Sequence, residues 1–140
     1  MPVLIVSNPV DGTSQRVELD DQQLRALYGT RIGQVVEGAV AGMQGYKIKL
    51  TGGTDKDGIP MRPDVHGSAK ARVILSGGVG YKPKNGGEKK RKVVRGNTVS
   101  VETTFLNFAI VETPKGRKKA KKEPAEAEAS AKEKPSSPVL

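Results

Sequence analysis

Short segments in which apolar and polar side chains alternate with a period of two constrain the fold of this chain most strongly. Tyr46, Ile48 and Leu50 alternate with two lysines, as expected for a strand that buries one face. Further short apolar or alternating segments occur at residues 3–6, 16–19, 35–36, 72–75, 99–101 and 105–111. Turn residues such as glycine, proline and aspartate separate these segments at short intervals. The sequence therefore predicts a mainly β domain.

A small closed or nearly closed β-barrel is the architecture that we expect, because closure removes exposed strand edges. A sandwich of two sheets remains open as an alternative. The chain has no tryptophan, two phenylalanines and three tyrosines, so its core must consist mainly of valine, isoleucine and leucine. We expect this domain to span residues 1–112.

Residues 3–6 and 16–19 are expected to form a first β-hairpin around the turn residues 8–12, and one short helix is expected after it. Asp20 can cap it, and a glutamine three residues later completes a capping-box pattern. Leu24, Leu27 and Tyr28 form one apolar stripe at helical spacing, which we interpret as core packing. Gly29 follows where a left-handed residue commonly ends a helix.

Positive charge is concentrated in the second half of the chain. Residues 1–60 carry six basic and seven acidic groups, residues 61–122 carry sixteen and four, and residues 123–140 carry two and four. The formal net charge of +9 therefore arises from the middle range. Interspersed charges would suffice for solubility. Because each neutralised phosphate releases condensed counterions, this asymmetry indicates a polyanionic partner.

Several classes of function are excluded by what the sequence lacks. It has no cysteine, so disulfides and cysteine-based zinc or redox sites cannot form. The apolar run at residues 3–6 is too short for a signal peptide or a membrane span, so a soluble, intracellular protein without a membrane partner is expected. His66 is the only histidine and has no credible catalytic partner. We therefore expect no enzyme activity, no small-molecule substrate, no metal and no cofactor.

The segment Leu50–Met61 holds three glycines, two aspartates and a proline, which together predict a compact, turn-rich loop. Asp55 and Asp57 have the spacing of calcium ligands, but the third ligand and the terminal glutamate of an EF-hand loop are missing. Two interpretations remain open. The glycines can allow the backbone to approach a phosphate, or they can form a rigid turn that fixes the neighbouring strands.

The glycine-rich and lysine-rich segment 76–96 is expected to be an extended basic loop that contacts RNA phosphates. It lacks the Gly-Lys-Ser/Thr of a nucleotide-binding loop. Tyr81 can stack on a base or pack internally, and Arg91 and Arg95 can each bind a phosphate bidentately. A solvated or nuclear-localisation-like charge run is the alternative for Lys89–Lys92. The predicted RNA-binding residues are Arg72, Tyr81, Lys82, Lys84, Lys89, Lys90, Arg91, Lys92, Arg95, Arg117, Lys118 and Lys119.

The C-terminal residues 113–140 differ in composition from the rest. Lys115–Lys122 is a basic run, and residues 123–140 are rich in alanine, glutamate, lysine, proline and serine. Such a composition cannot form a packed core, so a flexible, disordered tail is expected.

Leu50–Met61 also resembles the signature of one family, the small-subunit ribosomal protein S-six of archaea and eukaryotes. That signature reads aliphatic, small, Gly-Gly, any residue, Asp, two residues, Gly, any residue, Pro-Met. The sequence matches it at Leu50, Thr51, Gly52, Gly53, Asp55, Gly58, Pro60 and Met61. Residues 5–9, 31–38 and 87–96 are also similar to the family, and the resemblance covers roughly residues 3–112.

The resemblance implies a β-barrel domain that is bound to small-subunit rRNA, supports subunit assembly and has no catalytic activity. It also implies a location on the cytoplasmic ribosome, with rRNA and neighbouring ribosomal proteins as partners. Eukaryotic members continue into a long basic helix with a phosphorylated serine cluster. Here Ser130, Ser136 and Ser137 lie in an acidic, proline-containing tail, so this short form resembles the archaeal type. A regulator or translation factor that binds nucleic acid transiently is the alternative function.

Overall fold

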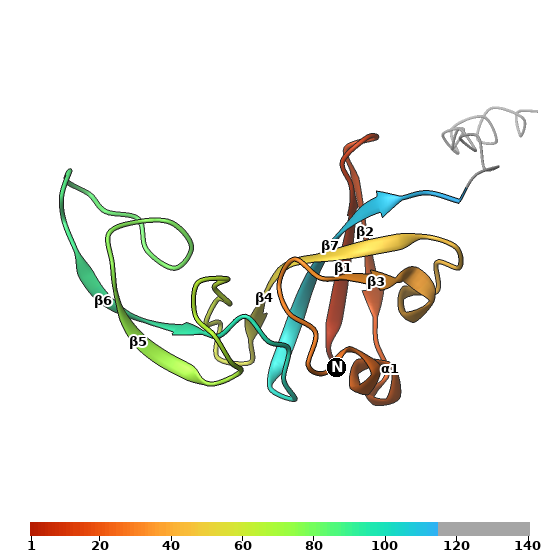
Figure 1. Ribbon diagram of the computed structural model, residues 1–140, viewed down its shortest axis with the longest axis horizontal. Helices are drawn as coiled ribbons and strands as arrows, with labels where there is room; N and C mark the ends of the chain where they lie inside the picture. The colour runs from red at the N-terminus through yellow and green to blue at the C-terminus, as the bar shows by residue number, and fades with distance from the viewer. Residues whose placement is uncertain (115–140) are drawn as a thin grey trace, which may run out of the picture.

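The computed structural model describes residues 1–114 and shows a mainly β chain with one α-helix (Figure 1). The elements are β1 (Val3–Asn8), β2 (Thr13–Glu18), α1 (Asp21–Leu27), β3 (Val35–Glu37), the 3₁₀ helix η1 (Gly38–Ala41), β4 (Lys47–Asp55), β5 (Lys70–Leu75), β6 (Lys90–Arg95) and β7 (Thr103–Glu112). None of the helices in this part of the chain is long and apolar enough to cross a membrane.

The main sheet has five strands in the order β2-β1-β7-β4-β3. Strands β1 and β7 run parallel, and the other neighbours are antiparallel. The prediction of a closed barrel is wrong, because β2 and β3 are the two edges of this sheet and do not pair with each other. Polarity and shortness protect these edges instead of closure: the residues of β2 are almost all polar and exposed, and β3 has only three residues.

Strands β5 and β6 form a separate antiparallel pair, which we call the ribbon. Figure 1 shows that the ribbon extends away from the main sheet and does not stack on it as the second layer of a sandwich would. The ribbon and the main sheet are joined by the two chain segments 56–69 and 96–102.

The hydrophobic core lies between one face of the main sheet and the helix α1. Alternate residues of the three central strands are buried there, such as Leu4, Ile48 and Phe108. Leu24 and Leu27 of α1 complete this core, as the apolar stripe predicts. The capping box is also confirmed, because the Asp20 amide donates a hydrogen bond of 3.1 Å to the side chain of the glutamine three residues later. Valine, leucine and isoleucine supply most of the core, with one buried phenylalanine.

The segment Leu50–Met61 is only partly the loop that its composition predicts, because β4 continues to Asp55. Gly53 explains why glycine is needed within a strand. A Cβ atom at Gly53 would overlap with the carbonyl oxygen of Phe105 and would lie 3.2 Å from the sulfur of Met61. The glycine therefore permits a close approach of β4 both to β7 and to the segment that contains Met61.

The strand predicted at residues 99–101 is absent. These residues lead into a turn, in which the Thr103 amide donates to the Ser100 carbonyl at 3.1 Å and the Ser100 amide donates to the Thr103 hydroxyl at 3.2 Å. Val99 is buried while Val101 is 73% exposed. The apparent alternation therefore comes from a core contact followed by a turn.

Candidate nucleic-acid interface

The ribbon and the segment that connects its two strands together carry most of the cationic side chains that the sequence predicts to bind RNA. Its strands pair from Lys70 with Arg95 to Leu75 with Lys90. The segment 76–96 is therefore not one extended loop, since residues 90–95 form β6. Apart from Gly96, the irregular part of the segment is residues 76–89, which we call the irregular connection. The local glycine and lysine content did not reveal that these residues would pair with β5.

Most of the predicted RNA-binding residues within the described range are accessible, either on the ribbon or in the connection between its strands. The side chains of Arg72, Lys82, Lys84, Lys89, Lys90 and Arg91 are exposed, whereas Lys92 and Tyr81 are half-buried. Burial raises the pKa of Tyr81, and the charge of the neighbouring Glu88 adds to this effect. Arg117, Lys118 and Lys119 lie outside the described residues.

Arg95 is the exception, because it is 4% exposed and fully engaged within the protein. Its guanidinium forms an ion pair with Asp55, donates to Glu102 at 2.6 Å and donates through Nε to the Ser68 carbonyl at 3.0 Å. The expected phosphate contact of Arg95 is therefore contradicted by its burial. Arg91, four residues earlier on the same strand face, remains exposed.

Arg95 belongs to a group of charged residues that we call the junction cluster, which consists of Asp55, Asp57, Lys70, Arg95 and Glu102. Lys70 contacts Asp57 and lies 3.2 Å from the carboxylate of Asp55. Asp55 also accepts a hydrogen bond of 2.6 Å from the Lys56 amide. The cluster lies where β4 ends and where both strands of the ribbon meet the main sheet. It fixes the base of the ribbon.

The pKa shifts of three residues in the junction cluster, Asp55, Glu102 and Lys70, favour their charged forms. Burial by itself raises the pKa of Asp55, but hydrogen bonds from the Lys56 amide and Lys70, together with the charge of Arg95, lower it overall. The hydrogen bond from Arg95 and the charge of Lys56 lower the pKa of Glu102. Hydrogen bonds to Asp57 and Asp55 raise the pKa of Lys70. The ion pairs of the cluster are therefore intact at neutral pH.

Backbone hydrogen bonds at the end of the segment Leu50–Met61, which matches the family signature, also fix the base of the ribbon. The Met61 amide donates to the Gly53 carbonyl at 2.9 Å, which connects this segment to β4. The Arg95 amide donates to the Pro60 carbonyl, and the Arg62 amide donates to the Arg95 carbonyl, both at 2.9 Å. These contacts support the interpretation of Leu50–Met61 as a rigid structural turn.

Neither a metal site nor an acid–base pair is evident in the part of the chain that the structure describes. Residues 1–114 contain no group of three or more His, Cys, Asp or Glu side chains that could hold a metal ion. Asp55 and Asp57, which have the spacing of calcium ligands, are both engaged with cationic side chains. His66 is exposed on the segment between β4 and β5.

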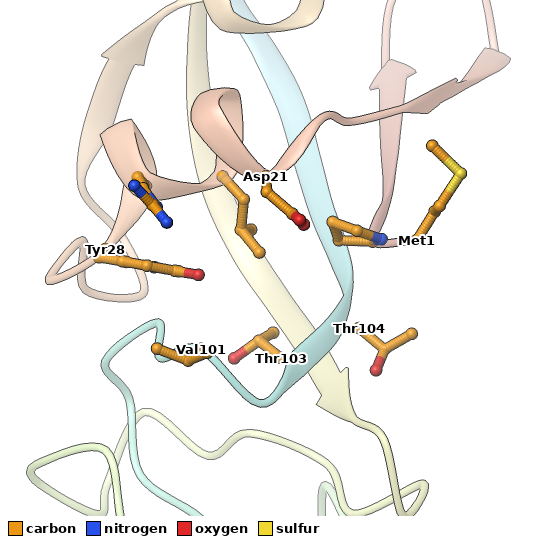
Figure 2. A pocket seen from close by; sticks show the side chains of 9 residues that line it. Met1, Asp21, Tyr28, Val101, Thr103 and Thr104 are labelled. Carbon is orange, nitrogen blue, oxygen red and sulfur yellow. The ribbon is translucent and has the colours of Figure 1, made fainter.

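A pocket with a volume of about 400 Å³ lies between the N-terminus, α1 and the start of β7 (Figure 2). Its lining contains Met1, Asp21, Arg25, Tyr28 and Thr103 among other residues. It offers one carboxylate and one guanidinium, and no histidine. This lining does not form a recognisable catalytic constellation.

Clustered basic residues on one part of a domain are the electrostatic footprint of nucleic-acid-binding proteins. The family model for ribosomal protein S6e matches residues 3–122 of this chain. Among similar proteins, the small ribosomal subunit protein eS6 of Methanocaldococcus jannaschii is 45% identical over 108 residues, which cover 77% of this chain and 80% of that protein. Its counterpart from Methanothermobacter thermautotrophicus is 45% identical over 105 residues, with 75% and 82% covered. The protein of that name from Archaeoglobus fulgidus is 40% identical over 109 residues, with 77% and 84% covered.

The chain belongs to the ribosomal protein S6e family. The resemblance that the signature segment indicated is therefore confirmed. As a member of this family, the chain is a structural protein of the ribosome in the cytoplasm and not an enzyme.

Sequence reasoning missed the role of Lys70 and Glu102. Both residues belong to the junction cluster, but their partners lie on other strands or turns, and Asp55 and Arg95 are 40 residues apart in the chain. The signature match at Asp55 was the only sign that this position had a special role. It could not show that the partner of Asp55 would be an arginine from the basic segment.

Proposed function

We propose that the chain is a structural constituent of the small ribosomal subunit that binds rRNA through its ribbon, and so supports subunit assembly and translation. The names of its archaeal relatives support the assignment to the small subunit. The proposed partners are small-subunit rRNA and neighbouring ribosomal proteins. The domain that carries this function is proposed to span residues 1–112.

The charge of the ribbon is the observation that best supports rRNA binding. Between Asp64 and Glu102, the chain carries nine basic residues and a single acidic one, Glu88. All of the nine except Lys92 and Arg95 are exposed on the ribbon or its irregular connection. A surface with such a density of positive charge favours binding to RNA, because each phosphate that its side chains neutralise releases condensed counterions.

The proposal is tested with a variant in which Lys89, Lys90, Arg91 and Lys92 are all replaced by alanine. Its affinity for purified small-subunit rRNA should fall, and the dependence of log K on log salt should flatten by about 0.7–0.9 for each phosphate that is no longer neutralised. A matched control removes four exposed cations from the other part of the domain, namely Arg16, Arg25, Arg31 and Lys49. An equal decrease of slope in both variants would show that only net charge matters and would contradict the proposed surface.

A regulator or translation factor that binds transiently is separated from a ribosomal constituent by fractionation of a cell extract on a sucrose gradient. A constituent of the small subunit remains with that subunit after a high-salt wash. A transient factor is released into the soluble fraction. Release at high salt would contradict the proposed structural role.

Arg117, Lys118 and Lys119 remain part of the proposed RNA-binding set, although they lie outside the described residues. Their basic run follows β7 closely in the sequence and lies within the range that the family model matches. Replacing these three residues with alanine should lower the salt dependence of rRNA binding. Unchanged salt dependence would remove them from the set.

A further inference from the structure

The two faces of the ribbon differ in composition. Antiparallel partners project their side chains to the same side of a strand pair. Arg72 therefore shares a face with its partner Val93, and Ile74 shares that face with its partner Arg91. We call these four residues the open face. The covered face on the opposite side consists of Ala71, Val73, Leu75, Lys90, Lys92 and Val94.

The chain itself packs against the covered face. Leu75 is 6% exposed and Val94 is fully buried. Gly80 brings the irregular connection close to both, since a Cβ at Gly80 would lie 3.2 Å from Val94, 3.4 Å from Pro60 and 3.7 Å from Leu75. Arg62 holds this part of the connection in place, because its guanidinium donates to the Val79 carbonyl at 2.8 Å.

The open face lacks such a cover. Ile74 is 62% exposed and Val93 is 37% exposed, although both are β-branched aliphatic residues. Arg72 and Arg91 are exposed beside them, and neither forms an ion pair within residues 1–114. Arginine and aliphatic side chains thus alternate across the two strands, with the arginines at diagonal positions.

We infer that the open face is the part of the ribbon that contacts RNA, and that it lies on the minor-groove surface of an RNA helix. This inference rests on the proposed function. The minor groove of an RNA helix is wide and shallow and presents ribose groups between two rows of phosphates, whereas the deep, narrow major groove excludes side chains. Arg72 and Arg91 bind phosphates, while Ile74 and Val93 lie against the riboses.

Charge complementarity favours RNA over an apolar groove on another protein. A protein groove that covered Ile74 and Val93 would also bury the guanidinium groups of Arg72 and Arg91, and burying unpaired charge is costly. A helix of RNA offers phosphates to both arginines and apolar ribose carbons to the aliphatic residues in a single surface.

The first test compares two double variants of the full chain that remove the same charge from opposite faces of the ribbon. With purified small-subunit rRNA, Arg72→Ala/Arg91→Ala should flatten the salt dependence by about 1.4–1.8, the value expected when two phosphates are no longer neutralised. Lys90→Ala/Lys92→Ala should flatten it by less than half as much. If both variants flattened the salt dependence to the same extent, the choice of face would be overturned but the proposed function would stand. If neither slope changed, the proposed function would fail as well.

The second test addresses the aliphatic residues with Ile74→Thr/Val93→Thr, which keeps the branched shape and the strand propensity. Affinity for rRNA should fall several-fold with an unchanged salt slope, because contact with ribose releases no counterions. Urea unfolding should match that of the unmodified chain, which shows that the ribbon is still folded. Unchanged rRNA affinity, combined with impaired incorporation into subunits, would show that this face binds another protein and would overturn the inference.

Discussion

Asp55, whose carboxylate is fully buried at the end of β4, forms an ion pair with Arg95 at the end of β6. The pair joins the last residue of a main-sheet strand to the last residue of a ribbon strand, 40 positions apart in the sequence. The signature of the family therefore includes one side of a contact that fixes the ribbon to the domain. Removing either partner leaves a buried charge with fewer counter-charges: Arg95 would keep only Glu102, and Asp55 would keep only Lys70.

Asp55→Asn is expected to destabilise the domain at the lower end of the roughly 3–5 kcal/mol that breaking a buried ion pair costs, because Arg95 keeps its ion pair with Glu102. The free energy of unfolding in urea measures this change. Asp57→Asn is the matched control. Asp57 contacts Lys70, as Asp55 does, but the side chain of Asp57 is 52% exposed. Its effect should stay below about 1 kcal/mol. Similar losses of stability in both variants would show that the pair between Asp55 and Arg95 has no special weight.

Acid should weaken the junction cluster in a defined pH range. The pKa values of Asp55 and Glu102 are lowered in the folded chain from 3.8 and 4.5, respectively. A lowered folded pKa contributes stability above the unfolded pKa, and this stability is lost as the pH falls through the folded value. The free energy of unfolding should therefore decrease below about pH 4.5 and continue to fall below about pH 3.8.

Urea unfolding at several pH values between neutrality and about pH 3 checks this dependence. In Asp55→Asn the acid-induced decrease should be smaller, because the substituted side chain does not titrate. An identical pH profile for both chains would mean that Asp55 does not contribute to acid sensitivity.

Gly53→Ala is expected to destabilise the domain by roughly 1–3 kcal/mol, as overpacking does in a tight site. The added methyl group would overlap with the carbonyl oxygen of Phe105 on the neighbouring strand. Gly52→Ala is the control, because a Cβ at Gly52 would have no atom within 4 Å. Thermal unfolding of both variants tests the difference. Equal midpoints would contradict the close approach of β4 and β7.

Deletion of residues 123–140 is expected to leave both folding and rRNA binding intact. These residues lie beyond the proposed domain and carry two basic against four acidic groups, so their deletion removes no net positive charge. The unfolding midpoint and the salt dependence of rRNA binding should match those of the full chain. A shortened chain that no longer unfolds cooperatively would show that the proposed domain boundary is wrong.

Local patterns were sufficient to predict the elements whose neighbours are close in sequence. The first hairpin follows from an apolar run and its turn. Helix α1 follows from Asp20 and the stripe of Leu24 and Leu27, and the alternation at Ile48 and Leu50 matches the burial of β4. In each of these cases, the residue pattern and the buried face belong to the same short segment.

The features that sequence reasoning missed depend on contacts between distant segments. Arg95 resembles every other cation of a basic run, and only its position opposite Asp55 shows that it is buried. The separation of the ribbon from the main sheet has the same origin, because pairing between β5 and β6 across the irregular connection leaves no strand to close a barrel. At Val99, the alternating pattern predicted a strand where the chain instead enters a turn.

Crosslinking within assembled small subunits tests most directly whether the ribbon binds rRNA. Intact subunits are irradiated, digested with protease and ribonuclease, and the peptides that carry nucleotides are identified by mass spectrometry. We expect crosslinked peptides from the ribbon, with Arg72 or Arg91 among the modified positions. Crosslinks confined to the main sheet, with none from β5, β6 or their connection, would contradict the proposed rRNA-binding surface.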